Sequence, residues 1–327
     1  MRAGNRSFAT RGRLIQLEML LTHMKILPVL IAGALCWFAV KAAAEPQLYV
    51  GVLEDVEAVN LSPAMSNIHV RVAFQKDGAV WIPMKGTFGT PEALARADSY
   101  FPASVNWTVV FSGRTIGTIA SKTSGPPMGY GDVGTQSIVT KPTDIPLVKA
   151  GASDFYYGDS KARTRPLLLV SAPNFKDPDG WKATTLTFAE KQLAVKNFRK
   201  KFPNMEQCKE PEEEPIYMVP YGDDEILLLK AYRSQSGEVL YGQRLDGKRS
   251  KCGFFDDENF FDYWFVLSAD QRIRLLDSQM TPIDAADLDN TGKSAWVFHT
   301  SRGEDRDGYE LFYDDFSKRA TFQWTYH

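Results

Sequence analysis

The sequence lacks the short motifs that mark the common catalytic chemistries. It has no Gly-x-Ser-x-Gly nucleophile turn, no His-Glu-x-x-His metal-binding helix and no complete Gly-x-x-x-x-Gly-Lys-Ser/Thr phosphate-binding loop. A glycine-rich stretch at 129–134 lies in a proline-rich segment with no helix predicted after it, so we interpret it as a surface loop. These absences favour a non-enzymatic role. They do not exclude a hydrolase whose acidic residues meet only in the folded chain.

Cysteine and histidine are also scarce, with three and four copies. Only Cys208 and Cys252 follow the N-terminal leader described below, and in an oxidising compartment such a pair most simply forms a disulfide. It would close a loop of about 44 residues and stabilise the fold by roughly 4 kcal/mol. Two unrelated buried thiols are the alternative. The remaining histidines, His69, His299 and His327, are too far apart for a zinc-binding pattern.

Long apolar runs are absent except for one near the N-terminus. Ile26 to Val40 spans about 15 residues, fewer than the roughly 20 that a membrane-spanning helix needs. A basic start at Met24-Lys25 precedes the run, and small residues follow it up to Ala44. We therefore predict a signal peptide with an upstream extension over 1–44, the true start being Met24. The mature chain is predicted to be secreted or periplasmic, without a membrane span.

Positive charge is not in excess. The chain has 38 basic and 40 acidic residues, and the leader holds more bases than acids, so the mature part is the more acidic. Without a basic cluster on an ordered scaffold, nucleic acid is a poor partner. Aromatic residues make up 12% of the chain, which excludes wholesale disorder and favours a packed core.

Apolar and β-branched runs recur along 45–327 at intervals of roughly ten residues, separated by glycine-containing turns. Asp77-Gly78 between two such runs predicts a hairpin, because glycine tolerates the positive φ of a tight turn. The pattern predicts a mainly β fold, an antiparallel meander that is propeller-like, with a β-sandwich as the alternative. We predict one mature domain, with an alternative division into halves at 45–180 and 205–327 joined by a helix.

One helix is predicted near 188–202. Thr187 and Glu190 have the spacing of a capping box, and Pro203 ends the run. Apolar residues recur at near-helical spacing between these two signals.

An acidic loop near the C-terminus carries the only spacing with recognisable chemistry. Asp287 and Asp289 alternate ahead of Gly292, with Thr291 at the next alternate position. Alternating oxygen ligands before a sharp turn suit calcium, a hard cation that binds six to eight oxygens. The sequence predicts a calcium site at Asp287, Asp289 and Thr291. The alternative is a turn whose carboxylates bond the loop's own amides.

This segment, 284–298, resembles the repeats of integrin-α-type propellers and the related FG-GAP/VCBS-like repeats of secreted bacterial surface proteins. The family pattern is Asp-x-Asp-x-Asp-Gly, then an acid before an apolar strand. Asp287, Asp289 and Gly292 match it, whereas Thr291 and Ala295 replace two of its acids. The resemblance implies a propeller blade and a calcium-stabilised, adhesion-type module. It covers about 15 residues in one degenerate copy.

Aromatic residues also cluster at 254–264 with acidic residues among them, which suits either a sugar-binding face or packing at the edge of a β core. Taken together, the sequence favours a secreted or periplasmic non-catalytic binding or structural β-protein. Its expected partner is a protein or glycan of the cell envelope. The alternatives are a carbohydrate-active hydrolase that uses loop carboxylates and the calcium-stabilised module. No cofactor other than calcium is indicated.

Overall fold

The computed structural model describes residues 47–55, 68–150, 164–173, 175–209, 217–247, 261–302 and 306–325. The predicted signal peptide and the start at Met24 lie outside these ranges, as do Cys252 and His327. Residues 47–327 form one compact unit, and the alternative division into two halves stays a prediction. Within the described ranges, no helix combines the length and apolar character needed to cross a bilayer.

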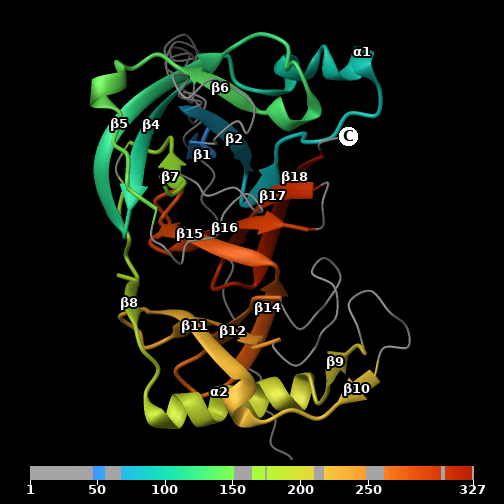
Figure 1. The fold of residues 1–327 in the computed structure, drawn as a ribbon. Coiled ribbons are helices and arrows are strands. Elements are labelled where there is room, and N and C mark those ends of the chain that lie inside the picture. The colour runs from blue at the N-terminus through green and yellow to red at the C-terminus, as the bar shows by residue number, and fades with distance from the viewer. Residues whose placement is uncertain are drawn as a thin grey trace, which may run out of the picture. The chain divides into compact units, whose positions relative to one another are not determined.

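The fold is mainly β with antiparallel pairing, as predicted. Six strands of the first half form a closed sheet in the order β1-β7-β4-β5-β6-β2, because β2 pairs back onto β1 (Figure 1). A short strand, β3, pairs antiparallel with the end of β2 through the predicted Asp77-Gly78 hairpin, where Gly78 has φ +54°. The strands are β1 (Tyr49–Asp55), β2 (Ile68–Asp77), β3 (Val80–Pro83), β4 (Ser104–Phe111), β5 (Arg114–Thr123), β6 (Thr135–Ile138) and β7 (Leu167–Val170).

The second half contains two successive meanders. A five-stranded sheet has the order β14-β13-β12-β11-β8, and a four-stranded sheet has the order β15-β16-β17-β18. Their strands are β8 (Lys182–Thr184), β11 (Ile226–Arg233), β12 (Val239–Leu245), β13 (Tyr263–Leu267), β14 (Ile273–Ser278), β15 (Met280–Ala286), β16 (Ala295–Ser301), β17 (Arg306–Tyr313) and β18 (Lys318–Thr325). Two further strands, β9 (Met205–Gln207) and β10 (Tyr217–Val219), pair with each other.

The predicted long helix is α2 (Phe188–Lys201). The Thr187 hydroxyl accepts from the amide of Glu190, and the Glu190 carboxylate accepts from the amide of Thr187, which confirms the capping box. Ala194 and Phe198 are its buried residues and pack in the apolar cluster of the five-stranded sheet. The only other α-helix in the described ranges is the single turn α1 (Pro91–Leu94), which a 3₁₀ turn at Ala97–Tyr100 follows.

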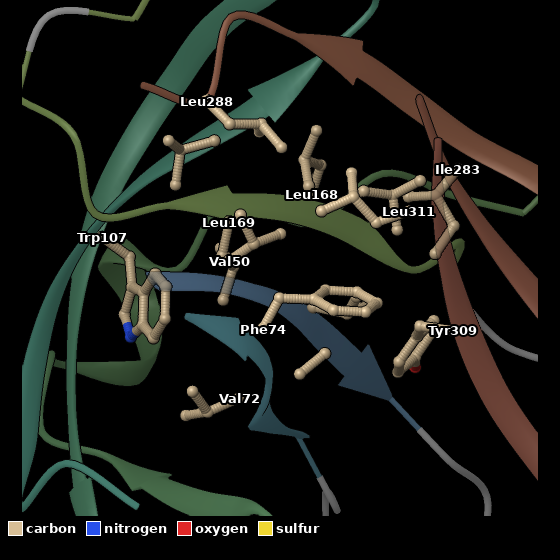
Figure 2. Close-up of a cluster of buried hydrophobic side chains, with 14 of the residues drawn as sticks. Val50, Val72, Phe74, Trp107, Leu168, Leu169, Ile283, Leu288, Tyr309 and Leu311 are labelled. Atoms are coloured by element: carbon tan, nitrogen blue, oxygen red, sulfur yellow. The ribbon is translucent and has the colours of Figure 1, made fainter. Parts of the chain in front are cut away.

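Three apolar clusters hold the sheets together. The largest joins the closed sheet to the four-stranded sheet, and Figure 2 shows Phe74 and Leu168 beside Ile283, Tyr309 and Leu311. A second lies between the two meanders and is built on tryptophans and phenylalanines: Trp181, Trp264, Trp296, Phe298 and Phe312. The third lies under α2.

The arrangement of sheets does not confirm the propeller. The two meanders each contain a four-stranded antiparallel run and pack on each other through the aromatic cluster. The first half instead closes on itself, because β7 pairs with β1 on one side and with β4 on the other. A propeller blade leaves its outer strands unpaired with one another, so the closed sheet of the first half does not form blades.

Candidate functional site

A dense group of ionisable and hydrogen-bonding side chains lies where the closed sheet meets the four-stranded sheet. We call it the Glu54 cluster. Its members come from both ends of the chain: Glu54, His69 and Arg71 from β1 and β2, and Tyr309 from β17. Trp324 of β18 covers Arg71, with the guanidinium carbon 3.9 Å from the ring centroid.

Strand register brings the first three residues together. Glu54 and His69 are direct cross-strand partners in the β1–β2 pair, and Arg71 is two residues further along β2 on the same face. Glu54 is 0% exposed and Arg71 is 4% exposed, so this charged pair lies in the protein interior.

The carboxylate of Glu54 is saturated with donors. Oε1 accepts from Arg71 Nε at 2.8 Å and from the Tyr309 hydroxyl, while Oε2 accepts from Arg71 Nη2 at 3.1 Å. His69 Nε2 lies 2.6 Å from the same Oε2. The remaining nitrogen of Arg71, Nη1, donates to the carbonyl of Val133 at 2.5 Å. The pair is bidentate and fixed, which is the strongest geometry for a guanidinium and a carboxylate.

Burial alone would raise the pKa of Glu54, but the charges of Arg71 and His69 and their hydrogen bonds outweigh it and hold that pKa well below its usual range. Glu54 is therefore ionised at neutral pH and acts only as an acceptor. A permanently ionised carboxylate with all its lone pairs engaged is suited to orienting its neighbours, not to exchanging protons.

His299 lies beside this cluster, on the strand next to Tyr309, with ring centroids 5.7 Å apart. It is 2% exposed, and burial lowers its pKa, so the imidazole is neutral at neutral pH. Its Nε2 is 3.8 Å from Asp307 Oδ1. The two histidines of the described chain, His69 and His299, thus lie near the same carboxylate although the sequence separates them widely.

The predicted calcium residues do come together in one loop, between β15 and β16. Asp287 Oδ1 accepts from the amide of Thr291 at 3.0 Å, and Oδ2 accepts from the amide of Gly292 at 2.8 Å. Asp289 Oδ1 accepts from the Thr291 hydroxyl at 2.8 Å, and its Oδ2 pairs with the ammonium of Lys76.

This geometry does not fit a calcium ion as it stands, because amides and an ammonium engage the oxygens that the ion would need. In the described ranges, no three His, Cys, Asp or Glu side chains are grouped to hold a metal. The hydrogen bonds instead match the alternative of a turn closed by its own carboxylates.

The predicted aromatic cluster at 254–264 and the predicted cysteine pair are only partly described by the structure. Tyr263 packs under α2, whereas Trp264 packs between the meanders. Residues 254–260 lie outside the described ranges, so a sugar-binding face there stays a prediction. Cys208 is buried after β9, and its disulfide with Cys252 also stays a prediction.

Comparison of the chain with family models, with curated proteins and with solved structures gives no match. Sequence inspection missed the Glu54 cluster, although one signal was present. A glutamate and an arginine each interrupt an apolar run, in two strands that pair directly.

Proposed function

We propose that the chain is a secreted or periplasmic, non-catalytic binding or structural β-protein, whose partner is a protein or glycan of the cell envelope. One observation carries the proposal. The Glu54 cluster has its carboxylate and guanidinium engaged by partners within the chain. These groups tie the closed sheet to the four-stranded sheet.

General acid–base catalysis needs groups that are not fully engaged within the protein. A general acid needs a pKa near the working pH and a proton to give, and a base needs a lone pair directed at its substrate. Glu54 has a lowered pKa and no spare oxygen. The guanidinium of Arg71 likewise donates its hydrogen bonds to Glu54 and to the carbonyl of Val133.

A hydrolase is the second candidate, because one residue of the cluster is not enclosed. The side chain of His69 is 22% exposed, and its Nε2 is held 2.6 Å from a buried carboxylate. A histidine oriented by a carboxylate is the general base of many hydrolases. The substrate expected from the sequence would be a carbohydrate.

The calcium-stabilised module is the third candidate. Its support is the family-like spacing of Asp287 and Asp289, and the amide bonds to Asp287 oppose it. A melting temperature that differs between calcium and chelator would support it.

A paired experiment separates binding from hydrolysis. The mature chain, 45–327, is tested for saturable binding to purified sacculi and outer-membrane vesicles, and for turnover of a polysaccharide, ester and peptide panel. His69→Gln is the matched variant, since glutamine keeps a donor toward Glu54 but is not a base. The proposal expects binding that His69→Gln retains and no turnover. Turnover that His69→Gln abolishes, at an unchanged melting temperature, would replace the proposal with the hydrolase.

A further inference from the structure

A second group of polar atoms lies in the apolar cluster under α2, away from the Glu54 cluster. Gln243 is 0% exposed and Tyr241 is 1% exposed, and both are on β12. Strand alternation puts them on the face that carries Val239 and Leu245, which belong to that cluster. Figure 1 shows α2 running beside β11 and β12.

The surroundings of these two side chains are aromatic. Tyr241 stacks on Phe265 with ring centroids 5.5 Å apart and an interplanar angle of 17°. Phe198 of α2 contacts the edges of Phe265 and Tyr263, at 6.1 and 5.8 Å. Tyr263 is the direct cross-strand partner of Gln243.

Three polar atoms in this place have no hydrogen-bond partner in the described chain: Nε2 and Oε1 of Gln243, and the hydroxyl of Tyr241. A buried amide or hydroxyl without a partner is strongly unfavourable, and such groups in folded proteins nearly always bond to something. Burial also raises the pKa of Tyr241, so the phenol stays neutral.

Gln136 in the closed sheet provides a matched contrast. It is 1% exposed and also lies on a strand, but its Oε1 accepts from Ser121 at 2.6 Å and its Nε2 donates to the carbonyl of Pro102 at 2.6 Å. The same chain therefore satisfies one buried glutamine fully with its own atoms.

The strand facing Tyr241 and Gln243 is irregular. In β11, the register shifts between Leu228 and Ala231, the residues that pair with Gln243 and Tyr241. A bulge leaves a residue out of the ladder and bends the strand, and bulges are common beside binding sites.

We infer that Gln243 and Tyr241 line an internal site for a neutral molecule that both donates and accepts hydrogen bonds. An amide and a phenol, both uncharged, recognise such a molecule better than an ion. Ordered water and a small neutral organic molecule share this chemistry, and an apolar body on the latter would suit the aromatic walls.

Stability measurements on the mature protein test the inference. Gln243→Leu removes both amide atoms at similar volume, and Tyr241→Phe removes only the hydroxyl. If a bound molecule satisfies these atoms, each variant lowers the melting temperature, by about 2–6 °C, in the same direction as the control Gln136→Leu. If the atoms are simply unpaired, both variants raise the melting temperature, and that result overturns the inference.

Refolding then distinguishes bound water from a bound organic molecule. Wild-type protein and Gln243→Leu are unfolded in denaturant, dialysed and refolded in plain buffer. A difference in melting temperature that persists identifies water. A difference that disappears or reverses, with a small molecule recovered by mass spectrometry from the native protein, identifies an organic ligand.

Discussion

Two buried glutamates lie at opposite faces of the four-stranded sheet, Glu54 from the neighbouring strand β1 and Glu310 from β17, and their environments differ. Glu54 contacts Tyr309 of β17, and the next residue along that strand, Glu310, points to the other face. Both are 0% exposed and both pair with arginine. The pKa of Glu54 is held low, whereas burial raises the pKa of Glu310 to about 7.

The number of arginines does not explain the difference, because Glu310 has two. Arg302 and Arg319 both donate to Glu310 Oε1, at 2.9 and 2.8 Å, but both also donate to Asp277 Oδ2, at 2.7 Å. Their side chains are 31% and 36% exposed, against 4% for Arg71. A guanidinium that binds two carboxylates and is partly exposed to solvent offsets less of the desolvation cost of a buried carboxylate. A buried guanidinium that binds a single carboxylate offsets more of it.

Removing the dedicated arginine should have the largest effect. Arg71→Met leaves Glu54 buried without its counter-charge and should lower the free energy of unfolding by about 3–5 kcal/mol, measured by urea denaturation. Arg319→Met is the control and should cost about 1 kcal/mol, because Arg302 remains and the site is partly solvated.

If Arg71→Met does not fold, the double variant Glu54→Leu/Arg71→Met should recover most of the stability, since it removes the charge as well as its partner. Equal effects of Arg71→Met and Arg319→Met would contradict the comparison.

Glu310 should make the stability of the fold depend on pH. Its pKa is about 7 in the folded chain against 4.5 for an ordinary glutamate, so the folded state takes up a proton more readily than the unfolded state. Glu310 therefore destabilises the fold above pH 7, and this penalty disappears as the pH falls from 7 to 4.5. The free energy of unfolding of Glu310→Gln should exceed that of wild type by up to about 3 kcal/mol at pH 8. This difference should disappear near pH 4.5. A difference that does not vary with pH would show that Glu310 is ionised throughout.

Glu54→Gln should show the opposite dependence. The pKa of Glu54 is lowered in the folded chain, so its ionised form contributes stability above the unfolded pKa and loses it as the pH falls below that value. We expect a loss of about 2 kcal/mol at pH 7, since hydrogen bonds to a charged group are replaced by neutral ones. Unfolding curves of the variant and of wild type should converge toward acid pH; divergence there would refute the assignment.

The smallest expected effect involves Lys76, which pairs with Asp289 in the acidic loop. Lys76→Ala should cost about 0.5–1 kcal/mol, because the pair is only partly buried. Wild type should show the same melting temperature with calcium and with chelator, while Lys76→Ala frees Asp289 and should gain sensitivity to calcium. A rise of several degrees for wild type in calcium would restore the ion site and the module it implies.

The sequence predicted features whose determinants are local. Helix α2 depends on a cap and an end signal within 16 residues or so, and the hairpin at Gly78 depends on one turn. The bonding of Asp287 to its own loop was among the alternatives for the same reason. Closure of the first sheet depends instead on Leu167–Val170 pairing with β1, far away in the sequence.

The Glu54 cluster could not be predicted in full for a related reason. Glu54 and Arg71 stand out as charges in apolar strands, and their contact follows once the strands pair. Tyr309 joins them only because two sheets pack together, and the hydrophobic periodicity of the sequence does not predict which sheets pack.

The position of β7 in the chain has a consequence for the order of folding. A polypeptide that emerges from its N-terminus presents β1 and β4 long before Leu167–Val170, which pairs with both. Until that segment appears, the two earlier strands have unpaired backbone groups that other chains can add to. Folding of the first half thus waits for its last strand, and a stall in synthesis before residue 170 would expose an aggregation-prone intermediate.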